Sequence, residues 1–261
     1  LQTFESEEIE NDYRYDGTIY GVGENCAVDP IYPDDVPNFA TAPAVGVETR
    51  TVPTYRQARY LSRNPDDIAA PFSTLAGEDF EVLKTIASAM EEAHQQYEDF
   101  QEEVTATKSS AAKDQYKETL EAFERERKRF EAGIDVLGEY ERAYQAFTMM
   151  NEAFDRLGYD RWRTFQIVYI VMALPDIVAQ AKAREAAKEE DADDAARKAA
   201  KNALSEFDEE YGHHLDAADV IYFPTGGGKT EAYFGLVAFT AFHDRLRGKN
   251  FGMSAFTKFT L

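Results

Sequence analysis

A long stripe of apolar residues at helical spacing, between residues 78 and 157, constrains the fold of this chain more than any other feature. Its first part recurs at steps of three and four residues across a background of glutamates: Phe80, Leu83, Ala87, Met90, His94, Tyr97 and Val104. Its second part follows a pair of serines, residue types that cap helices, and contains Tyr116, Leu120, Phe123, Arg127, Phe130, Ile134 and Leu137. This period lays an apolar face along each helix. We therefore expect a helical hairpin or small bundle over residues 76–160, with Gly158 as its stop.

The region before this stripe has a different composition. Residues 1–75 hold seven prolines, which break any long periodicity: Pro30, Pro33, Pro37, Pro43, Pro53, Pro65 and Pro71. Proline punctuates turns and loops. An irregular leader is therefore expected, with short strands near residues 17–22 and 45–52.

The third predicted region, residues 161–261, opens with an apolar helix from Trp162 to Leu174 that Pro175 interrupts or ends. Residues 180–210 are then almost all alanine or charged, with Leu204 and Phe207 as the sizeable apolar exceptions. Such a composition favours a helix by propensity but offers little to bury. We expect an exposed charged helical insertion that cannot anchor a core.

The formal charge of −21 bears on the class of partner. A nucleic-acid motor attracts phosphates through a basic surface, so this acidity argues weakly against nucleic acid. A basic groove elsewhere in a longer protein, a basic protein partner, or adaptation to a high-salt cytoplasm would each account for it. Because the acidic residues are spread along the whole chain, we favour the last.

Several features bear on location. Cys26 is the single cysteine, the four histidines show no zinc spacing, and no apolar run approaches the roughly 20 residues of a membrane helix. His94 is expected to be a packed histidine, and His213 with His214 a loop feature. The chain begins with Leu1 and an acidic segment that does not resemble a signal peptide. We expect a cytoplasmic fragment that does not interact with a membrane.

The pattern that carries chemistry lies near the end of the chain. Residues 219–223 form an apolar, β-branched run typical of a buried parallel strand, residues 224–230 read Pro-Thr-Gly-Gly-Gly-Lys-Thr, and a helix is predicted from Glu231 to Leu246. Strand, glycine loop and helix in this order are what a phosphate-binding loop requires.

The residue types of the loop suit a nucleotide triphosphate. Gly226, Gly227 and Gly228 let successive backbone N–H groups point at phosphate oxygens, and the following helix adds its positive end. Lys229 supplies an ammonium for the β- and γ-phosphates, and the Thr230 hydroxyl can hold Mg²⁺. ATP and Mg²⁺ are therefore the predicted ligands, with Lys229 and Thr230 as catalytic residues. A glycine turn without phosphate function is the alternative.

At these residues the chain resembles motif I of superfamily-2 helicases, whose usual form is alanine-x-x-glycine-x-glycine-lysine-threonine, here with Phe223 in place of the alanine. Residues 223–233 resemble more narrowly the loop of the helicase-like DrmA family of DISARM anti-phage defence systems. The resemblance implies a RecA-like α/β domain and an ATP-dependent motor acting on DNA, with a defence-system protein as a further partner. It assigns nucleotide contacts to the loop residues Thr225, Gly226, Gly227, Gly228, Lys229, Thr230 and Glu231.

Two further segments carry the resemblance. Residues 161–166 look like the arginine-x-aromatic-glutamine element that precedes motif I, which implies nucleotide contacts for Arg163 and adenine reading by Gln166. Gln166 and Lys229 are 63 residues apart, farther than in related motors, and the charged insertion must account for the excess. A plain surface role is the alternative for Gln166. Residues 251–261 look like motif Ia, which implies nucleic-acid contacts for Thr257 and Lys258.

A complete motor needs a carboxylate pair that positions Mg²⁺ and the attacking water, and the chain stops before such a strand. We therefore expect this polypeptide alone to bind nucleotide weakly and not to turn it over, and its last 45 residues to be poorly covered. The predicted function is an ATP-dependent helicase or translocase. A P-loop ATPase of another class, and a helical adaptor with a vestigial loop, are the alternatives.

Overall fold

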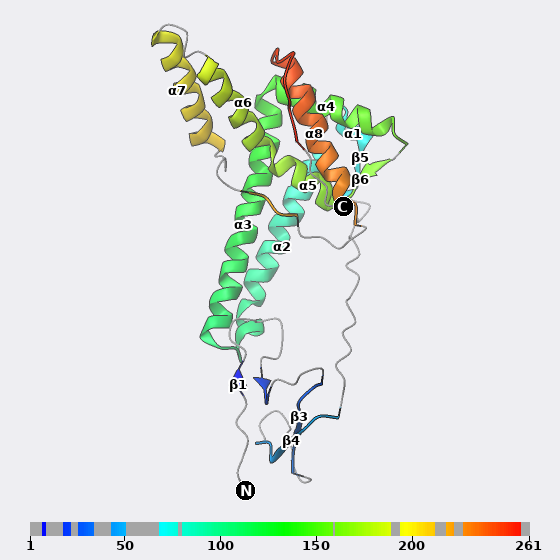
Figure 1. Ribbon diagram of the computed structural model, residues 1–261, viewed down its shortest axis with the longest axis vertical. Coiled ribbons are helices and arrows are strands. Elements are labelled where there is room, and N and C mark those ends of the chain that lie inside the picture. The colour runs from blue at the N-terminus through cyan, green and yellow to red at the C-terminus, as the bar shows by residue number, and fades with distance from the viewer. Residues whose placement is uncertain are drawn as a thin grey trace. The chain divides into compact units, whose positions relative to one another are not determined.

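The structure is a computed structural model that describes ten segments: residues 7–8, 18–21, 26–33, 43–50, 68–77, 80–158, 160–188, 194–211, 218–221 and 227–256. Within these segments the chain is mostly helical, with short two-stranded antiparallel sheets (Figure 1). It divides into two compact units, Leu1–Ala58 with His94–Phe123, and Arg59–Ala93 with Glu124–Leu261. The boundary predicted between residues 160 and 161 lies inside the second unit.

The first unit holds four of the short strands. Strand β1 (Glu7–Glu8) pairs with β2 (Thr18–Ile19), and β3 (Asp29–Ile31) pairs with β4 (Gly46–Glu48). The strands predicted near residues 17–22 and 45–52 are confirmed by β2 and β4.

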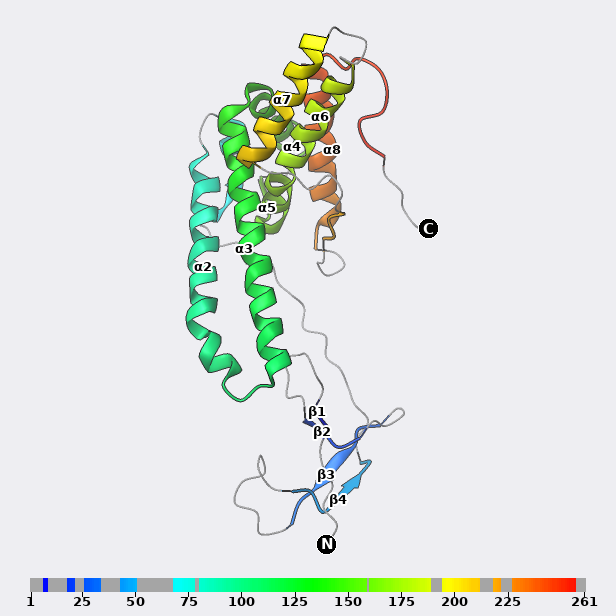
Figure 2. The ribbon, with the colours of Figure 1, turned by 90° about the vertical axis from the view of Figure 1, so that its left-hand side faces the viewer.

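The predicted helical hairpin is confirmed. Helix α2 spans Glu81–Thr105 and α3 spans Ser110–Glu139, and the two run side by side (Figure 2). The Ser109 hydroxyl accepts a hydrogen bond from the backbone N–H of Ala112 at 3.2 Å, which is the expected cap of α3. The hairpin does not continue unbroken, because Tyr140 adopts an extended backbone before α4 (Glu141–Asp155). Gly158 then takes φ +85°, as a helix stop requires.

The core of the second unit lies where several short elements meet. Strand β5 (Ala70–Pro71) pairs with β6 (Arg161–Trp162), and α1 (Phe72–Leu75) follows β5 directly. Helix α8 (Lys229–Leu246) contacts both α4 and α5 (Thr164–Met172). The buried side chains include Phe72, Phe130, Phe147, Met150, Trp162, Ile167, Ile170 and Phe239. Trp162 therefore belongs to a strand, and the apolar helix begins two residues after it.

The charged segment is helical as predicted. The prediction that it cannot anchor a core was wrong. Helix α6 (Leu174–Lys188) carries Pro175 in its first turn, and α7 (Asp194–Tyr211) contacts α6. The Phe207 side chain is 1% exposed and packs edge-on against Tyr140. The Lys182 ammonium lies over the rings of Tyr140 and Phe207. Phe207 is buried in the core, and Leu204 and Tyr211 of the same helix pack beside it.

The expected parallel strand is the main correction. Residues 218–221, the described part of that run, are not in a strand, and Val220 is 85% exposed. A strand needs a neighbour to complete its backbone hydrogen bonds, and the described residues provide no parallel partner for it. The described residues therefore do not show a RecA-like domain. We expected the last 45 residues to be poorly buried. This prediction was wrong for α8, because Phe239 is buried, and it was correct for the exposed side chains of Phe251, Met253 and Phe256 beyond it.

One stretch within the described residues, Thr164–Glu185, is apolar and long enough to cross a membrane. More than half of it is buried inside the protein. It also contains the break at Ala173 between α5 and α6. Packing of this kind is typical of a core helix.

Candidate functional site

The glycine turn before α8 is the centre of the candidate site. Gly228 is the N-terminal cap of α8 with φ +90° and ψ 27°, in the left-handed region that glycine adopts at least cost. The first backbone N–H groups of a helix have no partner within it and carry its positive end. Lys229 is the first residue of α8, half-buried, and Thr230 is exposed. Thr225, Gly226, Thr257 and Lys258 lie outside the described residues.

Two side chains at the start of α5 hold this turn. The Arg163 Nη1 atom donates a hydrogen bond to the carbonyl oxygen of Gly227 at 2.7 Å, and Gln166 Nε2 donates to the carbonyl oxygen of Gly228 at 2.7 Å. The family resemblance implied nucleotide contacts for both residues, and the fold places them against the glycine turn across more than 60 positions. The turn is therefore held on one side, by hydrogen bonds from the start of α5 to its carbonyl oxygens.

Gln166 uses both ends of its amide inside the protein. Its Oε1 atom accepts a hydrogen bond from the backbone N–H of Arg163 at 2.8 Å, which caps the first turn of α5. The side chain is 5% exposed, so the alternative of a plain surface residue is wrong. Burial of an amide is favourable only when its hydrogen bonds are satisfied, and here each end has one.

A side chain at Gly228 would displace the Gln166 amide. A Cβ atom built on Gly228 would lie 2.7 Å from Gln166 Nε2 and 3.3 Å from Glu231 Oε2. The left-handed backbone would add strain to this clash. The left-handed backbone and the contact with Gln166 therefore both favour glycine at this position.

A small cavity of about 110 Å³ opens beside the turn. Its lining residues come from α1, α4, β6, α5 and α8: Phe72, Phe154, Arg161, Trp162, Arg163, Gln166, Gly228 and Glu231. The Glu231 Oε2 atom is buried and has no hydrogen-bond partner among the described groups. A buried carboxylate oxygen without a hydrogen bond costs free energy. A hydrogen-bond donor that entered the cavity would therefore be stabilised there.

The apolar wall of the cavity is closely packed. The Trp162 ring centroid lies 4.9 Å from that of Phe72 and 4.4 Å from that of Phe154. The indole N–H donates to Asn151 Oδ1 at 2.8 Å, and Asn151 Nδ2 donates to the Phe147 carbonyl. The fully buried Asn151 thus fixes the tryptophan that supports the start of α5.

A half-buried arginine, missed from the sequence, ties the segment before the turn to the helices through two ion pairs. Arg129 of α3 donates to Asp176 of α6 at 2.7 Å and to Asp219 at 2.9 Å. The hydrogen bond from Arg129 brings together residues 90 positions apart, so no local pattern could signal it.

At the other end of α8 lies a second polar cluster. Burial would raise the pKa of Asp244, but hydrogen bonds from Lys249, Ser254 and Arg247 outweigh it and hold the pKa at about 2. Burial lowers the pKa of His243, with the Arg247 charge acting in the same direction. Among the described residues no group of three or more histidine, cysteine or acidic side chains could hold a metal ion.

No protein-family model matches the chain, and no curated protein matches it either.

Proposed function

We propose that the glycine turn and the start of α5 form one wall of an ATP site in a helicase-type motor that acts on DNA. The observation that supports this most is the fastening of Gly227 and Gly228 by Arg163 and Gln166. Two segments that resemble separate motor motifs meet in space, although helices α6 and α7 separate them in the chain.

The residues fit a phosphate group. Oriented N–H groups at the start of an 18-residue helix attract an anion, and Lys229 and Thr230 are the helix's first two residues. The cavity on the α5 side is too small for a nucleotide, because ligand pockets usually exceed about 300 Å³. The described residues thus suit one part of a nucleotide, and a complete site requires further protein surface.

The chemistry follows from the residue types. The Lys229 ammonium and the backbone N–H groups of the turn would hold the phosphates, and the Thr230 hydroxyl would hold Mg²⁺, which neutralises charge as the γ-phosphoryl leaves. Arg163 and Gln166 act through the turn, because their hydrogen bonds go to its carbonyl oxygens. They are positioning residues, and their role is to keep the N–H groups directed at the phosphates before ATP arrives.

Binding of a fluorescent ATP analogue with Mg²⁺ tests the proposal. Lys229→Ala should raise the dissociation constant at least tenfold, equivalent to about 1.4 kcal/mol. Lys117→Ala, in an exposed lysine of α3, is the matched control and should leave it unchanged. Equal affinities for the two variants, both folded by circular dichroism, would refute an ATP site and leave the adaptor with a vestigial loop.

A second variant separates positioning from adenine reading. If Gln166 positions the turn, Gln166→Ala should weaken ATP, GTP and inorganic tripolyphosphate by similar factors. If it reads adenine, as the resemblance implies, the variant should remove only a preference of ATP over GTP. An ATPase assay on a longer protein that includes the acidic pair, with and without single-stranded DNA, then distinguishes a DNA motor from another class of P-loop ATPase.

A further inference from the structure

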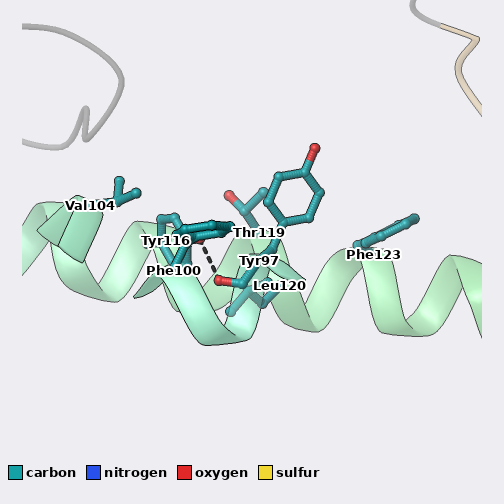
Figure 3. Close-up of a pocket in the computed structure, with 7 residues that line it drawn as sticks. All are labelled: Tyr97, Phe100, Val104, Tyr116, Thr119, Leu120 and Phe123. Atoms are coloured by element: carbon teal, nitrogen blue, oxygen red, sulfur yellow. Dashed lines mark hydrogen bonds between the residues drawn. The ribbon is translucent and has the colours of Figure 1, made fainter. Parts of the chain in front are cut away.

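The end of the helical hairpin that belongs to the first unit carries an apolar groove of about 600 Å³ (Figure 3). Three of its lining residues come from α2 and four from α3: Tyr97, Phe100, Val104, Tyr116, Thr119, Leu120 and Phe123. Four of these seven are aromatic. The groove is therefore built from the side chains that contribute most at protein interfaces.

The floor of the groove is fixed. Tyr116 and Leu120 are buried, and the Tyr116 hydroxyl donates a hydrogen bond to the Tyr97 carbonyl oxygen at 2.6 Å (Figure 3). The Phe123 ring meets the Tyr97 ring edge-on, with centroids 6.3 Å apart. These contacts join α2 to α3 across the hairpin.

The walls are exposed to solvent. Tyr97 is 54% exposed, Phe100 53% and Val104 39%. Scattered exposed apolar residues are ordinary, but these three follow one another at helical spacing and line one groove. Removing this surface from water would be favourable, so the groove is a place where another apolar surface can bind.

The surroundings of the groove are acidic. The helical part of the first unit, residues 94–123, contains seven acidic and three basic residues. Exposed carboxylates adjoin the groove residues in both helices, namely Asp99 and Glu103 in α2 and Glu118 and Glu121 in α3. A ligand with positive charge beside its apolar face is therefore favoured.

The same charges disfavour binding within or between copies of this chain. Residues 1–58 contain eleven acidic and three basic residues, and the whole chain carries −21. Like charges brought together at an interface cost free energy. An occupant taken from the leader or from a second copy would bring more negative charge to an acidic rim.

We propose that this groove binds a basic amphipathic helix of a partner protein. The groove lies between two helices, each with an apolar stripe, and a third helix can pack along it with apolar residues at positions i, i+3, i+4 and i+7. Lysine and arginine residues beside that stripe would face the carboxylates of the rim. The site is independent of the glycine turn and of any nucleotide.

Titration of the whole chain with three designed 18-residue peptides tests the proposal by fluorescence anisotropy. The first peptide has leucine at amphipathic spacing and lysine elsewhere, the second has the same composition in scrambled order, and the third has glutamate in place of lysine. The first should bind at least tenfold more tightly than the other two, and added salt should weaken it. Equal binding of the amphipathic and scrambled lysine peptides would show only bulk attraction to an acidic protein and overturn the proposal.

Two phenylalanine variants locate the binding. Phe100→Ser should weaken the amphipathic lysine peptide at least tenfold, whereas Phe251→Ser removes a ring that is 90% exposed in the second unit and should have no effect. Equal binding by both variants would place the peptide elsewhere. Self-association of the chain that Phe100→Ser abolishes would assign the groove to a second copy, and this also contradicts the proposal.

Discussion

The end of the helical hairpin and the contact between α5 and α8 differ in how far their aromatic side chains are exposed. At the hairpin end, Tyr97 and Phe100 are more than half exposed on their helix. At the contact of α5 with α8, Trp162 and Phe239 are at most 2% exposed. Both regions have amphipathic or apolar helices, so the helical pattern does not decide whether a ring is buried. A neighbouring element decides it, and each difference can be tested by removing a side chain.

The largest effect is expected from Trp162→Ala. The change removes a buried indole that contacts Phe72 and Phe154 and leaves Asn151 without its donor, so the free energy of unfolding should fall by roughly 3–5 kcal/mol. Chemical denaturation followed by circular dichroism measures it. Trp162→Phe is the matched variant and should lose less, because it keeps a ring. A loss below about 1 kcal/mol for the alanine variant would contradict the packed arrangement at β6.

The next effect concerns the approach of α3 to α5. A Cβ atom on Gly133 would lie 2.1 Å from the Val171 carbonyl oxygen, so Gly133→Ala must shift a helix and should destabilise the protein by about 1–3 kcal/mol. Gly138, on the same helix, has nothing within 4 Å of such an atom, and Gly138→Ala should stabilise by about 0.5–1 kcal/mol. Thermal unfolding of the pair gives changes of opposite sign. Two stabilising results would show that α3 and α5 are not in close contact.

A smaller effect concerns pH at the far end of α8. The pKa of His243 is lowered in the folded protein by burial, so the unfolded chain takes up a proton more readily. Stability is therefore complete above the unfolded pKa of about 6.5 and is lost as pH falls through the folded value. Melting temperature between pH 7.5 and 5 should decline more steeply for the native chain than for His243→Gln. Parallel curves would mean that His243 titrates normally.

The smallest effect on stability is expected at the groove. Phe100 is 53% exposed, so Phe100→Ser should change the free energy of unfolding by less than about 0.5 kcal/mol. Phe147→Ser, at a fully buried position of α4, is the contrasting variant and should cost several kcal/mol. A large loss for Phe100→Ser would show that the ring already has a covering partner within the chain.

Local patterns predicted most of the helical architecture. The apolar stripes predicted the hairpin, the serine pair predicted the cap of α3 at Ser109, and glycine predicted the turns at Gly158 and before α8. These features could be predicted because helical spacing, capping and φ depend on residues near in sequence. The prediction of a parallel strand was wrong at residues 218–221, because a strand depends on a neighbouring strand that no local pattern reveals. The prediction that the helix containing Phe207 cannot anchor a core was wrong for a related reason. One apolar side chain in a charged helix is exposed or buried according to what lies opposite.

The sequence by itself determined which segments form helices, where glycine is needed, and which residue types could meet a phosphate. Tertiary structure alone decided that Arg163 and Gln166 hold the carbonyl oxygens of the turn, and that Arg129 reaches Asp219. It also left the rings of Tyr97 and Phe100 without cover while burying Trp162. Helix formation is governed by neighbours within four residues. Hydrogen bonds and burial between distant segments depend on how those helices pack.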